Sequence, residues 1–192
     1  YDNNGTTLLS NDFNYTSVTT TVNNLAAGDY YAKVDNYSAS YHSSYALSLS
    51  VTSPAYANDP EPNGSLAEAV PMLTNSTVEG HIGYRNNGTI YDQNDYYVFT
   101  LSEPGDVTLS INKLPGQYNT LYLLNSVGAT LESQSNYGAF SITENDLPAG
   151  VYYARLHYYS TSHFGGYALT NSYCPDVITI EATGETTFCD GE

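Results

Sequence analysis

The chain has very few basic residues. Its 192 residues include four Lys and Arg against twenty Asp and Glu, for a formal net charge of −16. So little positive charge makes nucleic acid and anionic membrane surfaces poor partners. No apolar run is long enough to cross a bilayer, so membrane insertion is not expected.

Tryptophan is absent, and there are one methionine and two cysteines, Cys174 and Cys189. Two cysteines alone do not make a zinc site, and their spacing is too wide for a Cys-x-x-Cys redox motif. They could pair in an oxidising compartment if the backbone lets them meet. Low Lys and Met with abundant Tyr, Thr, Ser, Asn and Gly suit a secreted β-protein.

Recognisable catalytic motifs are also missing. The sequence has no His-Glu-x-x-His, no Gly-x-Ser-x-Gly and no phosphate-binding loop. His157 and His163 lie close in sequence, but such a pair is more often a surface feature than a metal site. We therefore do not expect an enzyme.

Short alternating segments separated by turn residues predict an all-β fold, a jelly-roll-like antiparallel β-sandwich. One helical turn is expected over 65–69, with Ser65 as N-cap. Alternation places Tyr152, Ala154 and Leu156 inward and Tyr153, Arg155 and His157 outward. The expected strands are 77–84, 95–101, 107–111, 119–124, 130–133, 139–143, 151–159 and 167–170.

Residues 1–53 repeat the second half of the segment that follows. Leu25–Val34 matches Leu147–Leu156, and Tyr45-Ala46-Leu47 matches Tyr167-Ala168-Leu169. We predict a partial sandwich over 1–53, a complete one over 54–173, and a linker with the first strand of a further domain over 174–192. A half sandwich has open edges and half a core, so upstream residues or a neighbouring chain must complete it.

Oxygen-bearing side chains gather where the complete repeat begins. Pro60 and Pro62 favour extended backbone, which places Asp59, Glu61 and Asn63 along one edge. Asp92 and Asp95 could close a cage from a facing loop. Hard oxygen ligands without Cys or His suit Ca²⁺ rather than zinc. The alternative is a solvated acidic turn.

Four stretches resemble the bacterial pre-peptidase C-terminal domain, over about 58–172. The resemblance implies a jelly-roll-like sandwich appended to secreted enzymes and surface proteins, similar to collagen-binding domains of clostridial collagenases. It also implies calcium-ligand roles for Asp59, Glu61, Asn63, Asp92 and Asp95. The family usually has Asp where this chain has Gly64. This difference argues against a second, adjacent calcium ion and weakens the case for the first one. The stretches are 61–69, 78–82, 92–101 and 147–156.

The tail over 174–192 resembles the opening of immunoglobulin-like repeats in surface proteins of Bacteroidota. In those repeats the cysteine pairs further downstream, which would leave Cys189 unpaired here. A bridge between Cys174 and Cys189 is the alternative.

Tyrosine is the commonest aromatic residue, with 21 copies. We expect four tyrosines to point outward, where they could stack on sugar rings or an extended peptide: Tyr31, Tyr153, Tyr158 and Tyr159. The alternative is packing across the sheet. Arg155 has its repeat counterpart in Lys33, and an ion pair or cation–π contact competes with a ligand-anchoring role.

These features predict a non-catalytic, calcium-stiffened structural and adhesive module of a secreted or cell-surface multidomain bacterial protein, within an array or fibre. Its expected partners are adjoining domains or neighbouring protomers. The alternatives are a binding module for collagen-like peptide or polysaccharide, and an accessory domain of a secreted protease.

Overall fold

A computed structural model describes all residues except 3, 87–88, 91, 114–115, 161–162 and 177–192. The elements are η1 Leu66–Glu68, β1 Val70–Pro71, β2 Ser76–Ile82, β3 Arg85–Asn86, β4 Thr89–Ile90, β5 Asn94–Leu101, β6 Gly105–Lys113, β7 Tyr118–Leu124, β8 Thr130–Tyr137, β9 Phe140–Leu147, β10 Gly150–Tyr158 and β11 Gly165–Pro175. Each strand expected from alternation is present, most of them a few residues longer than predicted.

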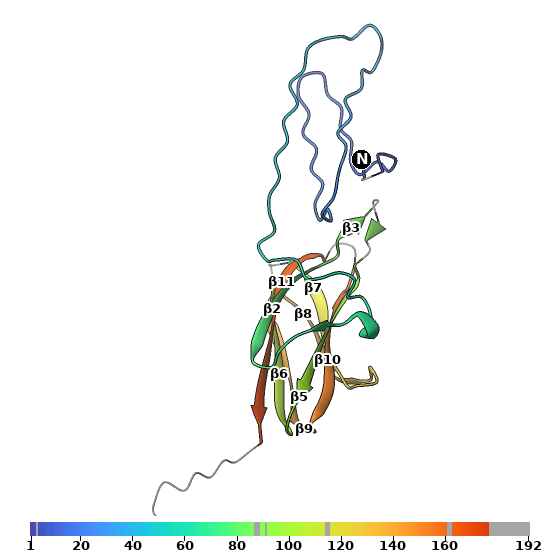
Figure 1. Ribbon diagram of the computed structural model, residues 1–192. Coiled ribbons are helices and arrows are strands. Elements are labelled where there is room, and N and C mark those ends of the chain that lie inside the picture. The colour runs from blue at the N-terminus through green and yellow to red at the C-terminus, as the bar shows by residue number, and fades with distance from the viewer. Residues whose placement is uncertain (3, 87–88, 91, 114–115, 161–162, 177–192) are drawn as a thin grey trace, which may run out of the picture.

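Two sheets face each other in a β-sandwich (Figure 1). One has the order β1-β5-β10-β7-β8 and the other β2-β11-β6-β9, and β3 and β4 form a separate ribbon. All pairings within the two sheets are antiparallel except that of β1 with β5, which is parallel. The predicted all-β sandwich is confirmed.

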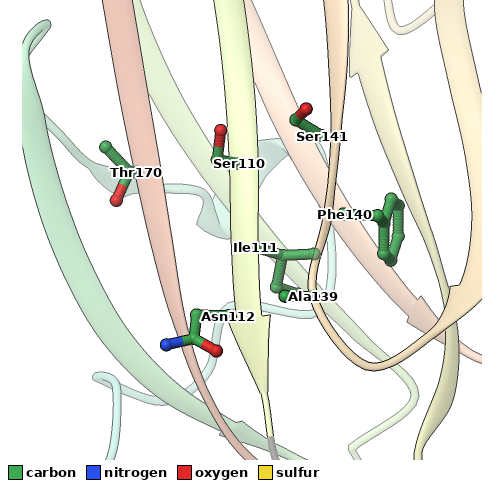
Figure 2. A pocket seen from close by; sticks show the side chains of 7 residues that line it. All are labelled: Ser110, Ile111, Asn112, Ala139, Phe140, Ser141 and Thr170. Atoms are coloured by element: carbon green, nitrogen blue, oxygen red, sulfur yellow. The ribbon is translucent and has the colours of Figure 1, made fainter.

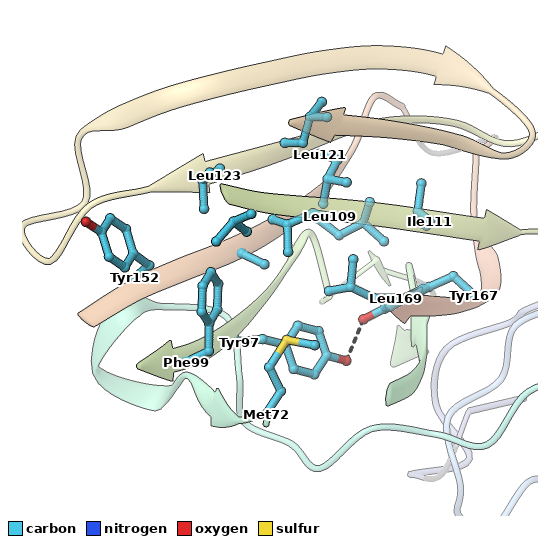
Figure 3. Packing of buried hydrophobic residues seen from close by; sticks show 14 of the residues in the cluster. Met72, Tyr97, Phe99, Leu109, Ile111, Leu121, Leu123, Tyr152, Tyr167 and Leu169 are labelled. Carbon is cyan, nitrogen blue, oxygen red and sulfur yellow. Dashed lines mark hydrogen bonds between the residues drawn. The ribbon is translucent and has the colours of Figure 1, made fainter. Parts of the chain in front are cut away.

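The core lies between the sheets and follows the predicted alternation (Figure 3). Val107, Leu109 and Ile111 of β6 are buried. Tyr152, Ala154 and Leu156 of β10 are likewise buried, against partly exposed neighbours at 153, 155 and 157. Burying one large apolar side chain stabilises the fold by about 1.5–3 kcal/mol, so the alternating faces fix the register.

Tyr158 does not lie on the outer surface as predicted. Only 8% of its side chain is exposed, because it continues the inward series of Leu156. Tyr158 and Tyr159 are consecutive, so they point to opposite sides of the chain, and the exposed one is Tyr159.

The expected helical turn is a short 3-10 turn, η1. Ser65 precedes it, but its side chain makes no capping bond to the backbone. Its hydroxyl instead donates to a carboxylate oxygen of Glu68 over 2.7 Å.

Residues 1–53 contain no strand among those the structure describes. They run in extended passes beyond one end of the sandwich (Figure 1). One isolated bridge joins Leu25 to Arg85, and many large apolar side chains of the segment are exposed. Within this single chain, the segment therefore does not complete a sandwich.

The complete domain is entered and left at opposite ends. Asp59 lies beside the start of β5 and the Tyr167 end of β11, whereas Pro175 ends β11 at the far end. An extended strand rises about 3.4 Å per residue, so the 11 residues of β11 span about 35 Å. Cys174 near this exit is exposed. Cys189, its alternative bridge partner, and the predicted following domain lie outside the described residues.

Candidate metal site and aromatic surface

Five residues form the acidic entrance of the domain: Asp59, Glu61, Asn63, Asp92 and Asp95. Among them, Asp59 is held by several hydrogen bonds. Its Oδ1 accepts a hydrogen bond from the backbone N–H of His81 over 3.0 Å. Its Oδ2 accepts bonds from the Asn63 amide at 2.6 Å and from the hydroxyls of Tyr97 at 3.0 Å and Tyr167 at 3.2 Å. The first residue of the entrance is thus fixed to both sheets.

Two oxygens of the site are buried and unpartnered. Asn63 and Asp95 are fully buried, yet Oδ1 of each makes no hydrogen bond. The other carboxylate oxygen of Asp95 accepts from the Tyr167 hydroxyl over 2.5 Å. A buried acceptor without a partner costs about 1–3 kcal/mol. These two oxygens therefore fit a site that receives a cation.

Glu61 lies at the rim of the same group. Carboxylate oxygens of Asp59, Glu61 and Asp95 all lie within 4.8 Å of one another. The Glu61 side chain is exposed, and its Oε2 accepts from the backbone N–H of Asn63 over 3.1 Å. The peptide bond between Glu61 and Pro62 is cis.

Asp92 lies beside this group but is not one of the three clustered carboxylates. It is buried, and its Oδ2 accepts from the Gly83 N–H over 2.9 Å. Burial raises its pKa to about 6. The structure therefore brings all five predicted ligands to one end of the sandwich, where the Asp92 charge adds to the negative charge around Asp95.

The electrostatics of the site are those of crowded, uncompensated carboxylates. Partial loss of solvent around the carboxyl group, followed by the charges of Asp92 and Asp59, raises the pKa of Glu61 to about 7. Burial and the same two neighbours raise the pKa of Asp95 well above its usual range. In the described part of the chain no Lys or Arg forms an ion pair with these groups. Mixed carboxylate and amide oxygens without Cys or His fit Ca²⁺.

Two tyrosines of the site were not predicted. Tyr97 on β5 and Tyr167 on β11 come from facing sheets, and their hydroxyls lie 2.7 Å apart (Figure 3). Gly80 makes room for them, because a Cβ there would lie 2.5 Å from the Tyr167 hydroxyl and 2.8 Å from that of Tyr97. Gly80, inside a predicted strand, was the signal in the sequence that could have pointed to this close approach.

A shallow depression of about 350 Å³ lies on the outer face of the β2-β11-β6-β9 sheet (Figure 2). Its lining offers hydroxyl, amide and apolar groups but no acid or base for proton transfer. The lining residues are Ser110, Ile111, Asn112, Ala139, Phe140, Ser141 and Thr170.

The predicted tyrosine surface is not one continuous face. Tyr31 is exposed in the N-terminal segment, and Tyr153 is half-buried on the outer face of β10. Beside it, the Arg155 guanidinium lies 4.2 Å from the ring centre of Tyr122 and 5.9 Å from that of Tyr96. Its cation–π contacts are confirmed, and Lys33, its repeat counterpart, pairs with Asp35 at 2.6 Å.

A different aromatic cluster forms near the end of the sandwich that carries the acidic entrance. The Tyr118 ring lies 4.7 Å from Tyr137, 5.0 Å from Tyr159 and 6.0 Å from His163. Tyr137 and Tyr159 are 59% and 68% exposed. His157 lies elsewhere, bonded to Asn94 over 2.9 Å, so the two histidines do not form a pair. Of the predicted tyrosines, only Tyr159 belongs to this cluster.

Comparison with known families identifies part of the domain. The family model described as the bacterial pre-peptidase C-terminal domain matches residues 93–157. This stretch runs from the start of β5 to the end of β10 and includes Asp95. The resemblance seen in the sequence is confirmed over these residues. No curated protein sequence matches the chain.

Several solved structures are similar to the chain. The pre-peptidase C-terminal domain of collagenase from Bacillus anthracis has 22% identity and a TM-score of 0.46, covering 60% of this chain and 100% of that one. PliG of Aeromonas hydrophila, a periplasmic inhibitor of g-type lysozyme, has 12% identity and a TM-score of 0.38, covering 55% and 96%. The Yersinia pseudotuberculosis-derived mitogen has 13% identity and a TM-score of 0.36, covering 59% and 95%.

Proposed function

We propose that the sandwich is a non-catalytic, calcium-binding structural and adhesive module of a secreted or cell-surface multidomain protein. The observation that carries the proposal is the pair of buried, unpartnered oxygens on Asn63 and Asp95, beside the carboxylates of Asp59 and Glu61. A divalent cation would satisfy both oxygens and offset the crowded negative charge.

Calcium at this position would stiffen the entry to the domain. Three of the ligands belong to the linker at 59–63, whereas Asp95 belongs to β5. The linker is already held at Ala57, whose N–H donates to a Glu79 carboxylate oxygen over 2.8 Å. A shared ion would remove further backbone freedom from the junction. Since Pro175 lies at the other end, successive domains would extend away from one another, as a spacer requires.

Calcium binding is tested by calorimetry and thermal unfolding of the whole chain, with excess calcium and with chelator. Calcium at about 100 times its Kd should add about 2.7 kcal/mol to the free energy of unfolding. This corresponds to a rise of about 10 °C in the thermal midpoint at which the sandwich unfolds. Asp95→Asn should remove the response. Asp106→Asn, in an acidic group at the far end, should retain it. No heat and no shift in the unmodified chain would refute the calcium site.

The exposed aromatic cluster favours a second candidate function, binding of polysaccharide or an extended extracellular peptide. Tyr137 and Tyr159 offer exposed ring faces and hydroxyls beside Tyr118 and His163. Such rigid amphipathic side chains give contact area at little conformational cost.

This second function is tested with immobilised collagen-like peptide and with soluble polysaccharides. Tyr137→Ser combined with Tyr159→Ser should weaken binding by about fivefold to about 150-fold, because each of the two stacking contacts contributes about 0.5–1.5 kcal/mol. Tyr56→Ser, outside the cluster, is the control. Equal binding by the double variant and by Tyr56→Ser would place the ligand elsewhere. If the unmodified chain also fails to bind, only the structural role remains as the proposed function.

A further inference from the structure

The N-terminal segment keeps the turn geometry of the second half of the sandwich. Asn24 has φ +57°, and Asp146, its counterpart in the repeat, has φ +55°. The two glycines that follow, Gly28 and Gly150, have φ +158° and +156°. Left-handed backbone is uncommon outside glycine, so its recurrence at Asn24 and Asp146 marks the same turn.

The hydrogen bonds within these turns are also repeated. The Tyr30 hydroxyl donates to the Ala26 carbonyl over 2.7 Å, as Tyr152 donates to Pro148 over 2.8 Å. In the next turn, the Tyr41 N–H donates to the Ser38 carbonyl over 3.1 Å. The counterpart there is the bond from the His163 N–H to the Ser160 carbonyl, over 2.9 Å.

Tyr1 occupies the position of the last residue of β7. Its amino group donates to the Tyr31 carbonyl over 2.8 Å, and the Tyr31 N–H donates to the Tyr1 carbonyl over 3.4 Å. The counterparts in the complete domain, Leu124 and Tyr153, are partners in the pairing of β7 with β10. The segment therefore contains the final residue of a β7-like strand, in register, and then the sequence that forms β8 to β11 in the complete domain.

The strand order explains why the rest of the segment forms no sheet. In the complete domain β8 pairs with β7, β9 with β6, β10 with β5 and β7, and β11 with β2 and β6. None of these four strands pairs with another of the four. A segment equivalent to β8–β11 therefore has no ladder partner within itself.

The core positions of the segment are exposed accordingly. Tyr45 is 72% exposed, whereas its counterpart Tyr167 is fully buried. Leu47 is 63% exposed against a fully buried Leu169. The strands are thus present in sequence and turn geometry but lack the surfaces that bury them.

We infer that residues 1–53 are the second half of a preceding sandwich, completed by a first-half segment of the same repeat type joined ahead of Tyr1. That segment would carry the pattern of residues 58–123, because Tyr1 itself takes the place of Leu124. It would place strands on both sides of 28–36, as β5 and β7 flank β10, and on both sides of 43–53, as β2 and β6 flank β11.

Tyr45 indicates which chemical groups the first-half segment ahead of Tyr1 must carry. In the complete domain the Tyr167 hydroxyl donates to Asp95 and Asp59, which both belong to the first half. Tyr45 should do the same to an acidic entrance in the incoming segment. The completed surface therefore selects a first half that has these carboxylates and a flanking apolar face.

The test joins a copy of residues 54–123 directly ahead of Tyr1 in the full chain, so that Tyr1 takes the place of Leu124. Backbone hydrogen exchange, followed by mass spectrometry, compares 28–36 and 43–53 in the fused and unfused chains. The unfused chain should exchange rapidly there, and the fused chain about 100-fold more slowly or better, approaching β10 and β11.

A matched pair of variants tests whether residues 43–53 are buried in a completed core or are only joined to the added segment. Leu47→Asp in the fused chain should remove the protection, because residue 47 points into the completed core. Ser48→Asp places the same charge one residue on, at the position of the partly exposed Thr170, and should retain it. Unchanged exchange in the fused chain would overturn the inference. The inference would also be overturned if the unfused chain became protected from exchange as its concentration rises. A second copy of the chain would then complete the N-terminal segment.

Discussion

The hydroxyl of Tyr167 donates to Oδ2 of Asp95 over 2.5 Å and leaves Oδ1 of the same carboxylate buried without a partner. The same hydroxyl lies 3.2 Å from Asp59 and 2.7 Å from the hydroxyl of Tyr97. One strand of the second half of the domain thereby holds two carboxylates of the first half. The acidic entrance is therefore assembled only when the two halves pair.

Replacing Tyr167 with Phe should destabilise the sandwich. The change removes the donor that the buried Asp95 carboxylate uses, at a cost of about 1–3 kcal/mol in the free energy of unfolding. Chemical denaturation in chelator measures the loss. Tyr152→Phe is the control, because the Tyr152 hydroxyl donates to the Pro148 carbonyl, away from the acidic entrance. Equal stability of Tyr167→Phe and the unmodified chain would show that this bond contributes little.

The strands of the sandwich could be predicted because each buries one face. Residues 107, 109 and 111 show the period of two directly, and β6 lies where that period placed it. Asp59, Glu61 and Asn63 could be predicted to lie together because two prolines fix their local spacing. Both signals are local, so neighbouring residues are enough to detect them.

The parts that escaped prediction depend on contacts between distant segments. Tyr97 and Tyr167 look like ordinary core residues until β5 and β11 lie on facing sheets and their hydroxyls meet. The prediction that both Tyr158 and Tyr159 point outward is wrong, because strand alternation allows only one of two neighbours on a face. The aromatic cluster likewise joins the start of β7 to the ends of β8 and β10.

Gly80→Ala should disturb the tyrosine pair without touching a carboxylate. A Cβ at this position would lie 2.5 Å from the Tyr167 hydroxyl, so the ring must shift. Overpacking of this kind costs about 1–3 kcal/mol. Thermal unfolding should show the loss, and the stabilisation by calcium should shrink because Asp95 loses its support. Gly116→Ala is unsuitable as a control because of its φ of +88°, so Ser110→Ala on the outer face serves instead.

Gly64→Asp should strengthen calcium binding. A Cβ at Gly64 would have the Asn94 carbonyl at 3.8 Å as its near neighbour, an ordinary contact, so a side chain fits. A further carboxylate beside Asn63 adds a charged ligand, and affinity rises with the charge of the ligand set, here by about tenfold. Calorimetry compares it with Gly64→Ala, which supplies the Cβ but no oxygen and should bind as the unmodified chain does. Equal affinities of the two variants would place residue 64 outside the coordination sphere.

Lys113 should make stability depend on pH in the alkaline range. Its Nζ is buried, donates to Asn119 over 2.8 Å and to the Asn136 carbonyl over 2.9 Å, and burial lowers its pKa to about 8. Between pH 8 and the unfolded value of 10.5 the folded chain has lost this proton while the unfolded chain keeps it. Unfolding then takes up a proton, so raising the pH favours the folded state.

Relative to Lys113→Met, the unmodified chain should therefore gain stability of order 2 kcal/mol between pH 8 and pH 10. Urea denaturation at fixed calcium measures the free energy of unfolding of both proteins. Groups other than Lys113 titrate alike in the two proteins, so their contributions cancel in the difference. The offset from losing the bond to Asn119 is constant with pH and does not affect the slope. Parallel curves would mean that Lys113 keeps its charge in the folded chain, held by the two oxygens and the Phe140 ring that lies 5.1 Å from Nζ.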